Sequence, residues 1–150
     1  MGGYQTVVVG TDGSETSFRA VDRAAALALD ADATLVIVCA YVPPRSDEIA
    51  ETQDRMGSDV AYQVVGSAPA DETLRTARER AQRAGLSKVE TEAVSGRPAD
   101  ALKQVVEARQ ADLLVIGNRG LNTLAGRIIG SVPLDVVRHT PIDVLVVHTT

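Results

Sequence analysis

Five short apolar runs, separated by longer segments of helical periodicity, dominate the pattern of hydrophobic and polar positions along the chain. Runs of this length, rich in Val, Ile and Leu, are typical of strands. They predict strands at residues 4–10, 34–40, 89–95, 112–117 and 143–148. The run at 34–40 is apolar without alternation, which indicates a strand buried on both faces, as in a parallel sheet covered by helices. The run at 89–95 alternates, so that strand is expected to be less buried.

The segments between the strands carry the spacing and the end signals of helices. They predict helices at residues 14–31, 69–84, 98–109 and 131–138. Gly85 lies where a helix commonly ends, and Pro98 lies in a first helical turn. The first helix is rich in alanine and can pack closely, and the positions expected on its inner face are Phe18, Val21, Ala25, Ala28 and Leu29.

Strands and helices alternate as βαβαβαβαβ, which predicts an α/β fold with a five-stranded parallel open sheet and helices on both faces. In such a sheet, ligands bind at the carboxyl ends of the strands where the chain reverses its direction. The loops richest in chemical groups follow the first and the fourth strand, and placing these strands side by side gives the order 3-2-1-4-5. Residues 45–66 mix polar side chains with isolated apolar ones and predict a long mobile loop, a candidate lid.

The composition fits one domain over residues 1–150 and argues against several kinds of partner. Apolar residues make up 45% of the chain, enough for a core without disulfides or metals. The 20 acidic and 15 basic residues give a net charge of -5 without runs of like charge, so we expect neither nucleic acid nor a membrane as partner. The first residues lack the basic and apolar pattern of a leader, and no apolar run is long enough to span a membrane. We therefore expect a cytoplasmic location.

Cysteine and histidine are too sparse to suggest redox or metal chemistry. Cys39 stands alone within an apolar run and is expected to be a small buried side chain. His139 and His148 lie apart, without another cysteine or histidine at ligand spacing. We expect no metal held by protein side chains and no catalytic residue.

The loop after the fourth strand has the glycines that a phosphate-binding turn requires. Gly117 and Gly120 allow backbone N–H groups to approach a phosphate without a Cβ in the way. Gly130 and Ser131 precede the last helix, where the serine can cap the helix and the helix start adds aligned N–H donors. The alternative interpretation is an ordinary glycine-rich loop followed by a capping serine.

The loop after the first strand supplies polar groups on the other side of the predicted crevice. Gly10 ends the strand, and Thr11 and Asp12 follow it before Gly13 and Ser14. Asp-Gly is also a common pair at turns and helix starts, so a purely structural role of Asp12 is the alternative.

The order 3-2-1-4-5 makes the last strand an edge of the sheet. Its apolar residues 144–147 would be exposed to water and open to pairing with another chain. Pairing with its own copy about a two-fold axis would bury them. The sequence therefore predicts a homodimer through residues 143–148.

Three separately placed motifs resemble the universal stress protein family, in its nucleotide-binding subclass. The family pattern is Gly-x-x-Gly, nine intervening residues, then Gly followed by Ser or Thr, and Gly117, Gly120, Gly130 and Ser131 match it without gaps. Residues 7–14 resemble the family's opening strand and turn, and residues 141–147 resemble its closing Pro-x-Pro-Val-Leu-Val-Val. The resemblance covers the domain except residues 45–66, implies a Rossmann-like fold, and extends to short actinobacterial members.

The resemblance also implies an ATP-type ligand between the first and fourth strands. Asp12 with Thr11 would face the adenosine, and Ala40, where the family usually has valine, would offer its backbone to the adenine edge. The positions expected around the ribose and the phosphates are Gly117, Gly120, Gly130, Ser131 and Val132. Arg119 and Arg127 could each reach an anion, although solvation at the surface is the more favoured role for both.

Several alternatives stay open at the level of sequence. Ile142 and Asp143 replace the two prolines of the closing motif. The family includes binders of ATP and of cyclic AMP, and the glycine pattern does not separate them. No carboxylate cluster indicates a metal site, so Mg²⁺ would enter only through the nucleotide. A regulatory binding module is the leading hypothesis, and a slow ATPase is its alternative, because Asp12 is the sole carboxylate near the site loops and they hold no His or Glu.

Overall fold

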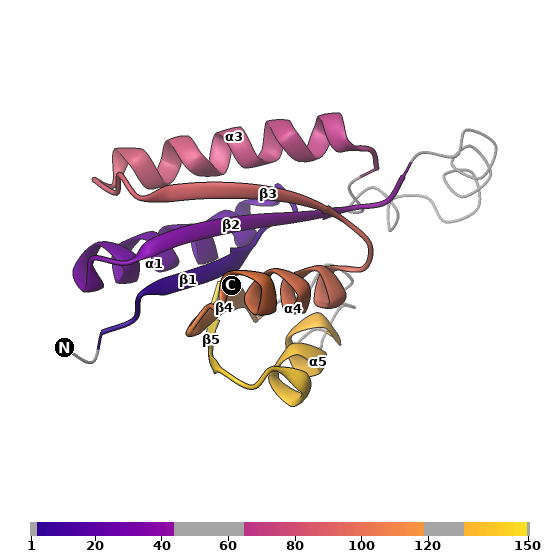
Figure 1. The fold of residues 1–150 in the computed structure, drawn as a ribbon. Helices are drawn as coiled ribbons and strands as arrows, with labels where there is room; N and C mark the ends of the chain where they lie inside the picture. The colour runs from indigo at the N-terminus through magenta and orange to yellow at the C-terminus, as the bar shows by residue number, and fades with distance from the viewer. Residues whose placement is uncertain (1–2, 44–64, 119–130, 150) are drawn as a thin grey trace.

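Strands and helices alternate along the chain in a computed structural model that describes residues 3–43, 65–118 and 131–149 (Figure 1). The elements, in chain order, are β1 (Thr6–Gly10), α1 (Glu15–Ala31), β2 (Thr34–Tyr41), α3 (Ser67–Arg83), β3 (Val89–Ser95), α4 (Pro98–Arg109), β4 (Leu113–Gly117), α5 (Ser131–His139) and β5 (Asp143–Val147). Every predicted strand and helix is present, with ends that differ by no more than two residues.

The strands form one parallel sheet in the order β3-β2-β1-β4-β5, as the sequence predicts. β1 begins at Thr6 rather than at residue 4, because the backbone N–H groups of Gln5 and Thr6 donate to the carboxylate of Asp112 instead of a neighbouring strand. Asp112 thus holds the start of β1 beside the start of β4.

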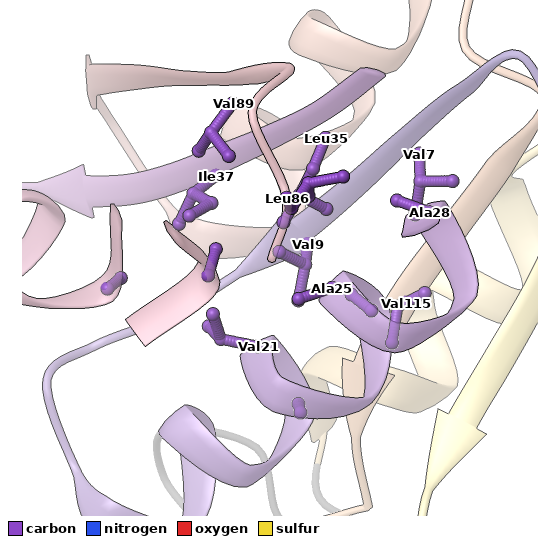
Figure 2. Packing of buried hydrophobic residues seen from close by; sticks show 14 of the residues in the cluster. Val7, Val9, Val21, Ala25, Ala28, Leu35, Ile37, Leu86, Val89 and Val115 are labelled. Carbon is purple, nitrogen blue, oxygen red and sulfur yellow. The ribbon is translucent and has the colours of Figure 1, made fainter. Parts of the chain in front are cut away.

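Helices cover both faces of the sheet (Figure 1). α1 and α3 pack on one face, where they share a buried cluster with Val7, Val9, Leu35 and Ile37, and Figure 2 shows these packed residues. Side chains that alternate with these along the strands point to the opposite face and pack against α4. The strands are therefore buried on two sides, which explains their continuous apolar runs.

The inner face of α1 is built from alanines, which let the helix lie close to the sheet. Phe18, Val21, Ala25 and Ala28 are buried, as predicted. Leu29 was expected inside but is 46% exposed, since the buried stripe runs through Ala25 and Ala28 and leaves Leu29 at its border. A Cβ built on Gly85, in the turn that ends α3, would lie 3.7 Å from the Leu29 side chain.

Two edges bound the sheet. β3 forms one edge and is less buried than β1, β2 and β4, as its alternating sequence predicts. β5 forms the other edge and is buried as little as β3. The predicted loop at residues 45–66 lies outside the described residues except for Val65 and Gly66, and Val65 forms a parallel bridge with Val42. No described helix is long and apolar enough to cross a membrane. The cytoplasmic location stays a prediction.

Candidate functional site

The carboxyl ends of β1 and β4 lie side by side at the point where the chain reverses its course across the sheet. β1 pairs with β2 on one side and with β4 on the other, in parallel on both sides. Loops leaving two such strands diverge and open a crevice. The structure thus places the starting points of the two loops that carry the candidate binding residues on neighbouring strands.

Thr11 fixes the start of the first loop. Its backbone N–H donates to the carbonyl of Val38 on β2 at 2.9 Å, and its buried hydroxyl lies 2.8 Å from that of Ser17. The same hydroxyl accepts the N–H of Gly13 at 3.2 Å. The hydrogen bonds of Thr11 therefore fix the conformation of the first loop.

Asp12 supports the start of α1 with one carboxylate oxygen. Oδ1 accepts from the backbone N–H of Ser14 at 2.9 Å and from its hydroxyl at 2.6 Å. Ser14 in turn caps α1, because its Oγ accepts the N–H of Ser17 at 3.2 Å. Among the described contacts, the hydrogen bonds to this carboxylate all end on Oδ1. The described contacts of the turn thus leave Oδ2 without a hydrogen-bond partner among the described residues.

Gly10 and Gly13 of the first loop differ in the reason why glycine suits the position. Gly13 has φ +87°, a conformation that side chains other than glycine rarely adopt. A Cβ on Gly10 would instead meet Leu102 of α4 at 3.1 and 3.3 Å. A side chain at position 10 would therefore require Leu102 to shift by a few tenths of an ångström.

Ala40 lies at the same edge of the sheet. Gly10 pairs with Val38, so Ala40 lies two residues beyond the end of β1 along its neighbour β2. Its side chain is half-buried, and its other neighbour is Val94 of β3. This position leaves Ala40 beside the first loop, as the sequence predicts.

Cys39, next to Ala40, has no nucleophilic character at neutral pH. Burial, together with the negative charges of Asp12 and Asp71, raises the pKa of its thiol to about 12. The thiol stays protonated, so thiolate chemistry at this edge is excluded.

The second loop begins at Gly117 and Asn118. Gly117 pairs with Val147 of β5, and the backbone N–H of Asn118 donates to the carbonyl of Val147 at 2.8 Å. The Asn118 side chain is buried, and its Oδ1 accepts from the N–H of Thr149 at 2.9 Å and from its hydroxyl at 3.0 Å. The exit of β4 is thereby tied to the residues that follow β5.

The remaining predicted binding residues are only partly described. Arg119, Gly120 and Gly130 lie outside the described residues, as does Arg127. Ser131 and Val132 begin α5, which confirms the predicted helix start after the glycine motif, but their side chains are not described. Within the described ranges, no group of three or more His, Cys, Asp or Glu side chains could hold a metal ion.

A model of the Universal stress protein family matches residues 3–148. The chain belongs to the universal stress protein family. It is 52% identical over 150 residues to universal stress protein Rv1636 of Mycobacterium tuberculosis, with 100% of both chains covered. It is also 34% identical over 147 residues to a putative universal stress protein of Staphylococcus aureus, which covers 97% of this chain and 85% of the relative.

Solved structures of universal stress proteins share the fold of this family member. A universal stress protein in complex with cAMP is 44% identical, covers 99% of both chains and superposes with a TM-score of 0.76. The protein from Archaeoglobus fulgidus in complex with dAMP is 22% identical, with a TM-score of 0.67 over 95% of this chain and 96% of that one, and it shows the shared fold alone.

The site of this universal stress protein contains three residues that sequence reasoning missed. Ser17 fastens the first loop through Thr11 and the N–H of Asp12, and Asn118 and Thr149 bind each other at the exit of β4. The sequence does contain one indication that Asn118 matters, because this polar residue comes directly after a buried strand and lies inside the Gly-x-x-Gly motif. The sequence contains no such indication for Thr149, since its partner Asn118 lies 31 residues away.

Proposed function

We propose that this universal stress protein binds an adenine nucleotide in the crevice between β1 and β4 and acts as a regulatory module. The position of the two site loops at the chain reversal carries the proposal, because ligands of open parallel sheets bind there. The cAMP complex of a relative that is 44% identical over nearly the whole chain supports an adenine ligand.

Asp12 and Ala40 are proposed to recognise the nucleoside end of the ligand. Asp12 uses Oδ1 for the turn, so Oδ2 would accept a hydrogen bond from the ligand. Ala40 lies at the carboxyl edge of β2, where its backbone would meet the adenine edge. Gly117, Arg119, Gly120, Gly130, Ser131 and Val132 are proposed to surround the ribose and the phosphates.

The candidate ligands are ATP and cyclic AMP. The family resemblance implies an ATP-type ligand, the glycine motif fits both nucleotides, and the relative in complex with cAMP favours the cyclic nucleotide. A triphosphate requires more donors or a divalent cation than a cyclic monophosphate does. Mass spectrometry of the copurified small molecule, followed by calorimetry with ATP, AMP and cAMP, identifies the ligand.

The Asp12→Asn substitution tests the site while it preserves the turn. An asparagine oxygen still accepts from Ser14, but the charge and the second carboxylate oxygen are lost. We expect the Kd for the nucleotide to rise about tenfold, because one charge-assisted hydrogen bond is lost. The melting temperature should stay unchanged.

Asp112→Asn is the matched control, because Asp112 also accepts backbone N–H groups but lies at the opposite end of the sheet. Its nucleotide Kd should equal that of the wild type. If neither variant changes the Kd of a nucleotide that binds the wild type, Asp12 is not part of the binding site.

Binding without efficient hydrolysis is the proposed activity. Asp12 is the carboxylate of the first loop, and its Oδ1 already accepts two hydrogen bonds from Ser14. A hydrolase must orient water and neutralise charge at the phosphates. Steady phosphate release from ATP that is lost in Asp12→Asn would instead support the slow ATPase.

We also propose that the protein is a homodimer through β5. The described partner of β5 within the sheet is β4, so its other edge is open to a second copy. Leu145 is 37% exposed on this strand. Pairing of two β5 strands about a two-fold axis would cover both copies of Leu145.

A further inference from the structure

Thr149 is hydrogen-bonded both to the exit of β4 and to α1, the helix that follows the first site loop. Its N–H and its hydroxyl donate to Oδ1 of Asn118 at 2.9 and 3.0 Å. Its carbonyl accepts from NH1 of Arg19 on α1 at 2.6 Å. The residue is only 2% exposed, so these bonds are shielded from water at the position of Thr149. One buried residue thus joins the exit of β4 to α1.

The orientation of the Asn118 amide follows from these contacts. A backbone N–H can only donate, so the atom facing Thr149 must be the amide oxygen. The amide nitrogen then faces His148, whose Nδ1 lies 3.3 Å away and accepts. With the backbone N–H of Asn118 bonded to Val147, this residue is held on both its backbone and its side chain.

The far end of this connection is the first site loop. Arg19 lies on the second turn of α1, directly after the turn in which Ser14 caps the helix and Ser17 fastens Thr11. A displacement of the first turns of α1 would therefore displace Thr11 and Asp12. Asn118, at the other end, directly follows Gly117 of the glycine motif.

We infer that Asn118, Thr149 and Arg19 form a clasp that sets the distance between the two halves of the nucleotide site. The three are positioning residues, and none is proposed to touch the ligand. The inference rests on the proposed function, since it assigns these residues a role in nucleotide affinity beyond their role in stability. A site held at the correct separation before binding loses less conformational freedom when the ligand arrives.

Affinity measurements on variants of the clasp test this inference. Asn118→Ala removes the acceptor of both Thr149 donors, and we expect nucleotide Kd to rise about tenfold. Thr149→Val removes only the hydroxyl and keeps the backbone bond, so an increase of about threefold is expected. Arg19→Ala should weaken binding as Thr149→Val does.

Two controls separate positioning from general loss of stability. Arg23→Ala removes an exposed arginine one turn further along α1. Asp112→Ala removes an acceptor of backbone N–H groups at the other end of β4, and urea denaturation measures its loss of unfolding free energy beside that of Asn118→Ala. Both should bind nucleotide with the wild-type Kd. Equal Kd values in Asn118→Ala and Asp112→Ala would overturn the clasp.

Hydrogen exchange of the free protein provides a readout that does not depend on the ligand. In Thr149→Val and Arg19→Ala, the backbone amides of residues 11–17 should exchange at least about threefold faster than in the wild type. The reason is that a segment held by fewer hydrogen bonds opens locally more often. Unchanged exchange there would show that the clasp does not reach the first loop and would overturn it. If the wild type binds none of the tested adenine nucleotides, the proposed function fails, whereas the exchange result still decides whether the clasp joins the loops.

Discussion

Gly13 combines two local constraints that no other side chain satisfies. Its φ of +87° favours glycine, and a Cβ at this position would lie 3.0 Å from Oγ1 of Thr73 on α3. We expect Gly13→Ala to lower the unfolding free energy by about 1–2 kcal/mol, because a residue with a Cβ is strained at this φ. Urea denaturation monitored by circular dichroism measures the change.

Gly3→Ala is the control for this substitution. Its Cβ would make only ordinary contacts with Ala31, at 3.7 Å or more, and the backbone φ is not positive. Its unfolding free energy should stay within about 0.5 kcal/mol of the wild type. Equal stability of the two variants would show that the turn at Gly13 relaxes without cost.

At single residues, the sequence predicts positions better than it predicts contacts. Thr11, Asp12 and Gly117 are predicted from their positions at or just after the ends of buried parallel strands, and the structure places these positions at one edge of the sheet. Their part in nucleotide binding stays a prediction. The turn role of Asp12 is also predictable, because Asp-Gly is a common pair at turns and helix starts. The bonds between Asn118 and Thr149 could not be predicted, because they join residues distant in sequence through a geometry that only the folded sheet creates.

At the scale of elements, α1 depends on small side chains where it meets the sheet. Ala25 is fully buried against the strands, and Figure 2 shows it packed among Val9, Val21 and Val115. We expect Ala25→Leu to lower the unfolding free energy by about 1–3 kcal/mol, since the added methyl groups enter a filled space. Chemical denaturation provides the measurement.

Ala26→Leu is a matched control one position further along the same helix. Ala26 is exposed, and leucine has nearly the helix propensity of alanine, so the unfolding free energy should change by less than about 0.5 kcal/mol. A loss of stability in Ala26→Leu as large as that in Ala25→Leu would contradict the packing argument.

The elements and their order were predictable because periodicity and burial agree along the chain. Strands covered on both sides read as continuous apolar runs, and helices with one buried face read as alanine and leucine at helical spacing. The predictions were wrong at the border of a buried helix face and at the start of a strand. Leu29 fits the helical spacing but lies beside the buried stripe, and β1 starts late because Asp112 takes the first N–H groups. A local sequence pattern contains no information on how side chains pack at the border of a helix. It also does not show that a residue more than a hundred positions away accepts the first N–H groups of a strand.

For the whole molecule, the prediction concerns assembly. We expect the wild type to sediment as a dimer at micromolar concentration, and Leu145→Glu to sediment as a monomer, because two carboxylates would face each other in the paired β5 edges. Analytical ultracentrifugation measures the mass, and circular dichroism verifies that the variant is folded.

Leu29→Glu is the corresponding control, since Leu29 is an exposed aliphatic side chain on α1, away from β5. It should remain dimeric. A wild type that is monomeric at micromolar concentration would rule out the β5 interface, whatever the behaviour of the variants.

The two edges of the sheet differ in character, and this difference limits how far copies can associate. β3 carries Glu90 and Glu92, both held by Arg109 of α4, whereas β5 is aliphatic after its first residue, Asp143. Joining two copies through β5 would leave a β3 edge at each end of the combined sheet. Charged edges resist further strand addition. Growth would stop after two chains, and a crowded cell would then hold discrete pairs rather than fibres.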